Sequence, residues 1–263
     1  MGNKKEIIAI KRLILDTVYK TNVGHITSSF SCVEILYAVY KYANLKGNIS
    51  NRLRDRVIIS KEHCRLAQVC ILAHLGFLDG KNLSSYCVSG GTLGHDLYNF
   101  VSEGIDAVDY ASGSLGHGLS VGAGMAFGDI EHHYYVLLGD AELQEGSIFE
   151  ALLFIIQQNI KNMTVIVDLN QLQIDNYTKN IIDTKALDLF NTLGFSTFEC
   201  DGHNVLELTK QLSISCDKPK CIIAHTIKGK GIEFLLNELN FAQFHHSALT
   251  QEQYCRAYEA INS

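Results

Sequence analysis

The sequence predicts an α/β fold built on a doubly wound, mostly parallel sheet with helices on both of its faces. Short apolar runs typical of buried strands recur along the chain, and stretches with helical spacing separate them. Parallel strands need such crossovers, because a tight hairpin can join only antiparallel strands. The chain has 263 residues, of which 47% are hydrophobic, and neither a repeat nor a proline-rich linker divides it. We therefore expect one domain that spans residues 1–263.

The expected elements alternate along the chain. In its first third, apolar spacing predicts two helices, a strand and a third helix, at 7–19, 33–42, 56–60 and 63–78. After an irregular segment at 89–112, further strands are expected at 134–138, 164–169, 195–200 and 220–226. Doubly wound sheets bind ligands at the carboxyl ends of their strands. Chemistry is therefore expected in the loops that begin at Gly139, Asn170 and Thr226.

Charge and composition argue against several classes of protein. The formal net charge is -6 with acidic and basic residues interspersed, whereas a nucleic-acid-binding surface needs clustered basic residues. No apolar stretch approaches the roughly 20 residues of a membrane-spanning helix, and the polar start of the chain does not resemble a secretory signal. The eight cysteines contain no Cys-x-x-Cys pair, which favours buried reduced thiols over a zinc site or disulfides. We expect a cytoplasmic protein whose ligand is a small molecule.

Two polar residues at neighbouring strand ends predict a metal site. Asp140 follows the strand expected at 134–138, and Asn170 follows the strand expected at 164–169. Their side-chain oxygens, with the backbone carbonyl of Leu172, form a reasonable cage for a hard cation such as Mg2+ or Ca2+. Alternatively, Asp140 caps the following helix and Asn170 forms an Asx-turn, which is the commoner role for either residue alone. The spacing and the strand context together favour the metal site.

A glycine-rich segment and a set of histidines add to this picture. In the segment 112–118, Gly113 and Gly116 allow the backbone to approach a ring or a phosphate at the start of a helix, although taken alone they are better explained by tight helix packing. The histidines in loop-like contexts are His25, His63, His95, His245 and His246. Imidazole donates hydrogen bonds to diphosphate or sugar oxygens and shuttles protons near neutral pH. Histidines that converged in one cleft would suit polyol chemistry, which sequence spacing alone does not establish.

These motifs resemble the amino-terminal region of transketolases. The Gly-Ser-Leu-Gly, Gly-Asp-x-Glu and Asn-x-Leu elements occur in the order that this family has, and the similarity spans nearly the whole chain. The matching segments are 24–29, 55–63, 94–95, 139–146, 168–175, 225–231 and 244–246. The resemblance implies a thiamine diphosphate-binding fold, with thiamine diphosphate and a divalent metal ion as cofactors. It also implies transfer of a two-carbon ketol unit between sugars or sugar phosphates.

The resemblance also implies roles for individual residues. Asp140, Asn170 and the carbonyl of Leu172 would hold the metal. The residues around the cofactor would be His63, Gly113, Leu115, Gly116, Gly139, Asp140, Ala141, Glu145 and Asn170, with His63 and the Ala141 amide at the diphosphate. The residues that face the substrate and assist its proton transfers would be His25, His95 and His245. Glu145 and Glu150 resemble acids that meet the dimer partner near the cofactor.

The chain contains nothing that resembles the second domain of a single-chain transketolase, which supplies the glutamate that activates the cofactor's aminopyrimidine. We therefore expect a split enzyme of α2β2 form that is active only with a separate pyrimidine-binding subunit. The helix expected at 147–158 is apolar nearly all round, which is consistent with burial against another subunit and almost equally with burial in the core.

Several alternatives stay open. Another thiamine diphosphate enzyme acting on pyruvate, similar to deoxyxylulose-phosphate synthase or pyruvate dehydrogenase, would share the metal and diphosphate elements, although the separated histidines favour a sugar. A noncatalytic scaffold subunit is suggested by Glu62 and Ala141, which replace glycines that are usual in the family. A nicotinamide-binding Rossmann domain is disfavoured, because the glycines at 113–118 lack the first strand and the later acidic residue of that fingerprint.

Overall fold

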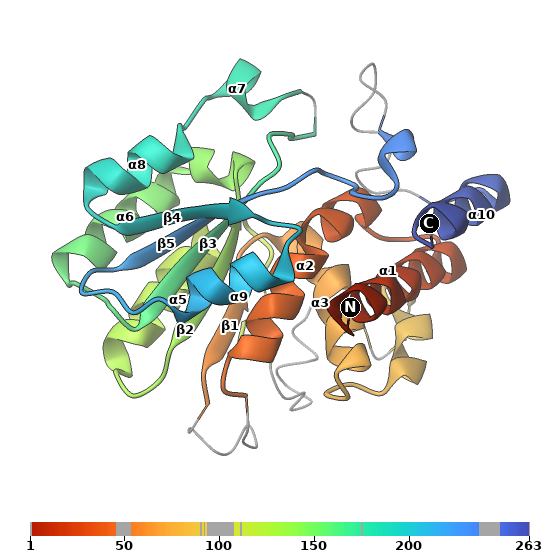
Figure 1. Cartoon of the computed structure of the whole chain (residues 1–263), viewed down its shortest axis with the longest axis horizontal. Helices are drawn as coiled ribbons and strands as arrows, with labels where there is room; N and C mark the ends of the chain where they lie inside the picture. Colours follow the sequence, from red (N-terminus) through yellow and green to blue (C-terminus); the bar gives the residue numbers. More distant parts are fainter. Residues whose placement is uncertain are drawn as a thin grey trace.

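The core of the molecule is a sheet of five strands in the order β1-β2-β3-β5-β4, and all neighbouring strands are parallel (Figure 1). The strands are β1 (Arg56–Ile59), β2 (Tyr134–Gly139), β3 (Met163–Leu169), β4 (Ser196–Asp201) and β5 (Lys220–His225). Both ends of every strand lie within one residue of the range expected from the sequence. This computed structural model, which describes residues 2–45, 54–89, 91, 93, 108–110, 112–174, 176–236 and 248–262, confirms the α/β fold class.

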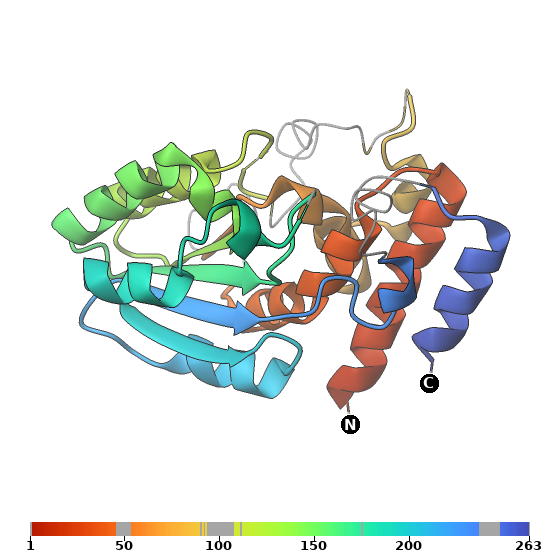
Figure 2. The same ribbon diagram turned by 90° about the horizontal axis from the view of Figure 1, so that it is seen from above.

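Helices cover both faces of the sheet, as Figure 2 shows from above. One face carries α5 (His117–Gly128), α6 (Gly146–Gln157) and α8 (Ala186–Leu193). The other carries α2 (Ile26–Tyr42) and α9 (Val205–Ser213). Successive side chains of a strand point to opposite faces, so Val57 packs in the core under α2 whereas Ile58 packs in the core under α5. The sheet is thus covered on both sides, which explains why β1, β2, β3 and β5 are mostly apolar, whereas β4, at the end of the strand order, is partly exposed and more polar.

The remaining helices lie beyond the edge of the sheet or in its loops. The helices α1 (Gly2–Thr21), α3 (Arg65–His74) and α10 (Gln251–Ala260) pack around α2, with α10 against α1 (Figures 1 and 2). The shorter elements are η1 (Glu62–Cys64), η2 (Gly80–Ser85), η3 (Ala141–Gln144), α7 (Thr178–Ile181) and η4 (Glu233–Leu235). The elements η1, η3 and η4 follow strand ends, where the site is expected.

Helical boundaries differ from the sequence-based expectation in two places. The helix expected at 33–42 begins at Ile26, because its first turns bury the polar side chains of Thr27, Ser28, Ser29 and Ser31, which apolar spacing cannot reveal. The helix expected at 63–78 is divided into η1 and α3, and α3 ends at His74. Gly76, with φ of +82°, adopts a left-handed conformation just after that end.

The structure bears on two expectations from composition. Within the described ranges, no helix is both long and apolar enough to cross a membrane. The eight cysteines are all free thiols: Cys255 is exposed, Cys87 and Cys216 are half-buried, and the others are buried. The expectation of reduced, mostly buried thiols therefore agrees with the structure.

Candidate functional site

A cavity of about 250 Å³ lies at the carboxyl edge of the sheet, beside the ends of β2 and β3. It brings together the polar side chains of Asp140, Asn170, Lys61, His63 and Lys228, which come from loops far apart in the sequence. These loops meet because the strands are parallel and all end at the same edge. Expected site residues that line the cavity are His63, Leu115, Gly139, Asp140, Ala141, Glu145, Asn170 and Leu172.

Asp140 connects the two strand-end loops. One carboxylate oxygen accepts a hydrogen bond from the Ala141 amide at 2.8 Å, and the other accepts one from the Gln171 amide at 2.5 Å. Asn170 accepts a hydrogen bond from the Leu172 amide at 3.1 Å, which is the Asx-turn considered from the sequence. The two side chains therefore make local backbone contacts and still line the cavity. Because each such oxygen carries two lone pairs, these contacts leave acceptor capacity for a cation.

Burial disfavours the ionised form of the Asp140 carboxyl group. Burial, and next the nearby carboxylate of Asp168, raise the pKa of Asp140 to about 6. A divalent cation bound to Asp140 would remove this penalty by supplying positive charge at the carboxylate. Asp140, the Asn170 amide oxygen and the Leu172 carbonyl are all oxygen donors at this cavity, as Mg2+ or Ca2+ requires. The residues present therefore fit a divalent metal ion.

A buried ion pair between Lys61 and Asp168 lies behind the cavity. Asp168 is fully buried, and its carboxylate also accepts hydrogen bonds from Ser31 Oγ at 2.7 Å and from Thr226 Oγ1. Although burial opposes ionisation, Lys61 and these hydrogen bonds hold the pKa of Asp168 below its usual value. Burial likewise opposes the charge on Lys61, but Asp168 holds the pKa of Lys61 well above its usual range. The pair joins α2, β1 and β3 beneath the site.

Lys228 supplies a buried positive charge to the cavity. It is only 5% exposed and lines the cavity, and its ammonium group forms no hydrogen bond or ion pair with another residue in the part of the chain that the structure describes. Burial, and next the Lys61 ammonium, lower the pKa of Lys228 to about 8. A buried cation of this kind favours an anionic ligand. Cation-binding oxygens and an anion-binding ammonium thus share one cavity, which suits a metal-bound diphosphate.

The glycine-rich turn is anchored beside the cavity by Glu142. The carboxylate of this buried residue accepts hydrogen bonds from the amides of Gly116 at 2.8 Å and Gly139 at 3.0 Å, and from the Ser60 hydroxyl. Gly116 has φ of +84°, and a Cβ atom there would clash with Ser147 Oγ, so the turn needs glycine. Leu115 lines the cavity from this turn.

The other expected residues have different positions. His25 is the N-cap of α2, and its ring centroid lies 6.1 Å from that of His63, so two of the histidines do converge. Gly113 is exposed and does not line the cavity. His95, His245 and His246 lie outside the described residues.

Glu62 and Ala141, which suggested a noncatalytic scaffold subunit, both form identified contacts. Glu62 forms an ion pair with Arg65 at 2.6 Å and does not line the cavity. Ala141 keeps its backbone amide at the end of the cavity, where it hydrogen-bonds Asp140. Neither residue therefore obstructs the site.

Sequence reasoning did not assign a role to Lys61, Lys228, Glu142 or Ser28, although each lines the cavity. All of them lie inside segments that match the family, at 24–29, 55–63, 139–146 and 225–231. The signal that could have found them is a charged or polar residue close in the sequence to an expected site residue. Lys61, two positions before His63, is an example.

Comparisons with known proteins agree with this geometry. The family described as "Transketolase, thiamine diphosphate binding domain" matches residues 2–260. An apulose-4-phosphate transketolase subunit from Phocaeicola vulgatus is 31% identical over 263 residues, covering 96% of this chain and 90% of the relative. A 6-deoxy-6-sulfo-D-fructose transketolase subunit from Clostridium sp. is 32% identical over 266 residues, covering 93% and 90%.

The comparison with solved structures also identifies the fold as that of transketolases. The transketolase from Campylobacter jejuni superposes with a TM-score of 0.81 at 25% identity, and the match covers 98% of this chain but 42% of that one. The chain therefore spans about two fifths of the solved transketolase, whereas it spans nine tenths of the Phocaeicola vulgatus protein. Fold, site and sequence agree that this chain belongs to the transketolase family, as a thiamine diphosphate-binding domain.

Proposed function

We propose that this chain is the diphosphate-binding subunit of a split transketolase, which transfers a two-carbon ketol unit between sugars or sugar phosphates. The observation that carries the proposal is the cavity in which the oxygens of Asp140, Asn170 and Leu172 lie beside the buried ammonium group of Lys228. Such a site satisfies a divalent metal ion and a diphosphate at the same time. We place the protein in the cytoplasm, since its cysteines are free thiols.

Each side of the cavity has its own task in this proposal. Asp140, Asn170 and the Leu172 carbonyl hold the metal, while Lys228 and His63 bind the diphosphate. The Ala141 amide, which donates to Asp140 in this structure, would exchange that contact for a diphosphate oxygen. Leu115 and the Gly116 turn flank the cofactor rings. When bound, thiamine diphosphate supplies the electron sink that carbon–carbon bond cleavage requires. His25, next to His63, orients hydroxyl groups of the substrate and moves protons to and from them, and we propose the same role for His95 and His245.

An apolar surface on α5 and α6 supports the requirement for a partner. Phe127, Phe149, Leu153 and Phe154 on α5 and α6 are between 38% and 60% exposed. The rings of Phe127 and Phe154 meet edge to face, with centroids 5.5 Å apart, so these side chains form a connected patch. The helix α6 begins directly after Glu145, which lines the cavity. A pyrimidine-binding subunit seated on this patch would close the cofactor site, and two copies of each subunit would give an α2β2 enzyme.

Ketol transfer is expected to require the second subunit. We expect this chain alone to show less than a tenth of the activity of its mixture with a separately encoded pyrimidine-binding subunit, because the cofactor site is completed only at the interface. Mass spectrometry of the products from a ketose phosphate donor and an aldose phosphate acceptor measures this activity. Full activity of the isolated chain would contradict the split-enzyme proposal, and release of carbon dioxide from pyruvate by the mixture would favour the alternative reaction.

The affinity for Mg2+ and inorganic diphosphate is expected to be greatest between about pH 6 and pH 8. Below about pH 6 Asp140 becomes protonated and cannot hold the metal, and above about pH 8 Lys228 loses the charge that attracts the anion. Replacing Lys228 with Met should remove the alkaline decline, whereas replacing the exposed Lys210 with Met should not. Calorimetric titrations across this range measure both effects. Because the ligand's own titration is common to all three proteins, an unchanged alkaline decline in Lys228→Met would contradict the role of Lys228.

A further inference from the structure

The loop that carries Lys228 separates two cavities. Lys228 lines the cofactor cavity, whereas Lys230 and Gly231 line a larger cavity of about 740 Å³ next to α1 and the start of α9. A backbone hydrogen bond from Gly229 to Thr27, at 2.9 Å, ties the loop to α2. Side chains in the wall of the larger cavity therefore lie next to the loop that carries Lys228.

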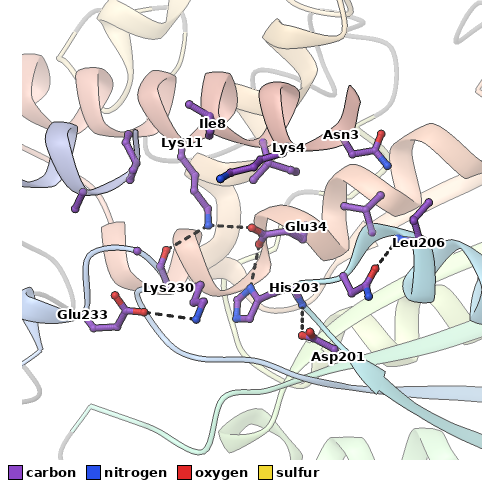
Figure 3. A pocket seen from close by; sticks show the side chains of 16 residues that line it. Asn3, Lys4, Ile8, Lys11, Glu34, Asp201, His203, Leu206, Lys230 and Glu233 are labelled. Atoms are coloured by element: carbon purple, nitrogen blue, oxygen red, sulfur yellow. Dashed lines mark hydrogen bonds and ion pairs between the residues drawn. The ribbon is translucent and has the colours of Figure 1, made fainter. Parts of the chain in front are cut away.

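Three side chains of the larger cavity, His203, Lys11 and Glu34, form a connected group that supports the loop, as Figure 3 shows. The Ile227 amide donates a hydrogen bond to His203 Nε2 at 2.8 Å, and the Lys11 ammonium donates one to the Lys230 carbonyl at 3.2 Å. Glu34 connects these two supports, because its carboxylate contacts His203 Nδ1 at 3.2 Å and Lys11 Nζ at 2.9 Å. The backbone is thus bonded immediately before Lys228 and again two residues after it.

The hydrogen-bond pattern determines the state of His203. Because the Ile227 amide is a donor, Nε2 must be unprotonated to accept from it, and the proton must reside on Nδ1, where Glu34 accepts it. Glu34 is only 5% exposed and Lys11 only 7% exposed, so both are ordered by the surrounding structure. The backbone of His203 is held as well, since its amide donates to Asp201 at 2.8 Å. The contact to Ile227 is therefore fixed in both position and tautomer.

We propose that His203, oriented by Glu34, is a positioning residue that holds the Lys228 loop in the geometry needed to bind the cofactor diphosphate. This inference rests on the proposed function. It adds to that function residues that lie outside the cofactor cavity. Displacing a group by about 1 Å can cost up to about 100-fold in the rate of an enzyme reaction, and a displaced ammonium group also loses part of its attraction to an anion. Loss of one of several loop contacts should cost about tenfold.

Two replacements of His203 separate its two nitrogens. The amide oxygen of Gln can take the place of Nε2 and accept from Ile227, whereas Asn reaches only the place of Nδ1 and leaves the Ile227 amide unpaired. We expect His203→Asn to weaken binding of Mg2+ and inorganic diphosphate to the full chain about tenfold, and His203→Gln to stay within about threefold of the original protein. His132→Asn is the matched control, since His132 contacts Asp129 at the opposite edge of the sheet.

A double-mutant cycle with Lys228→Met tests whether His203 acts through Lys228. If it does, adding His203→Asn to Lys228→Met should weaken binding less than twofold further. An equal loss from Asn and Gln, an unchanged affinity in His203→Asn, or a full tenfold additional loss in the double mutant would each overturn the inference. Thermal unfolding of every variant identifies losses that come from misfolding. If the original chain binds no Mg2+ and diphosphate, the proposed function fails first, so the two failures are distinguishable.

Discussion

Replacing Asp140 with Asn is expected to weaken binding of thiamine diphosphate in the presence of Mg2+ by at least about 100-fold, because a direct metal ligand should matter more than the outer contacts that cost 10–100-fold. The neutral amide keeps one acceptor for the neighbouring amides of Ala141 and Gln171, but it loses the negative charge that the metal requires. Calorimetry of the chain with its second subunit measures this affinity.

The prediction for Asp140→Asn has a matched control and an outcome that would contradict it. Asp217 is an exposed residue just before β5, at the opposite edge of the sheet, and its replacement with Asn should leave the affinity unchanged. Thermal unfolding of both variants shows whether either of them has lost structure. An Asp140→Asn variant that folds normally and binds the cofactor as the original protein does would exclude Asp140 as the metal ligand.

Replacing Asp168 with Asn is expected to lower the free energy of unfolding by about 3–5 kcal/mol. The replacement leaves the Lys61 ammonium, which is 1% exposed, without its counter-charge in the interior. Since the pKa of Asp168 is held below its usual value, the stabilisation is present above the unfolded pKa of about 4 and is lost as the pH falls through the folded pKa. Urea-induced unfolding at pH 7 measures the difference.

An exposed contact between His225 and Glu199 provides the comparison for Asp168. His225 and Glu199 are in contact at 2.7 Å, but both side chains are nearly half exposed. Glu199→Gln should therefore change the free energy of unfolding by no more than about 1 kcal/mol. If Asp168→Asn were equally mild, the Lys61 charge would have to be relieved in some other way, and the description of the pair as a buried support of the site would be wrong.

The sheet could be predicted closely from the sequence, because β1, β2, β3 and β5 are largely buried and therefore appear as mostly apolar runs. The strand β4 is partly exposed and more polar. The start of α2 could not be predicted in this way, since its first turns bury serine and threonine side chains beside the site rather than apolar ones. One of these, Ser31, donates to Asp168, and another, Ser28, lines the cavity, so part of the polar run that obscures the helix in the sequence belongs to the site. A local apolar pattern fails where polar side chains are buried beside a site.

The candidate site was predictable only in part. The strand-end rule led to Asp140 and Asn170, because their positions depend on topology alone. The roles of Lys228 and Glu142 could not be predicted, because they depend on contacts that form only in the folded chain. Glu142 accepts hydrogen bonds from two loops, and Lys228 is left without a partner in the described chain. These contacts cannot be deduced from the sequence, although both residues lie in segments that match the family. The hydrogen bond of His203 to Ile227 depends in the same way on loops that meet only in the fold.

The anomalous signal of Mn2+ tests the central claim most directly. In crystals of the complete enzyme grown with thiamine diphosphate and Mn2+ in place of Mg2+, we predict an anomalous peak within about 2.5 Å of oxygen atoms of Asp140, Asn170 and Leu172. Diphosphate density should lie between this peak and the ammonium group of Lys228. A metal peak elsewhere, with an empty cavity at the ends of β2 and β3, would contradict the proposed cofactor site.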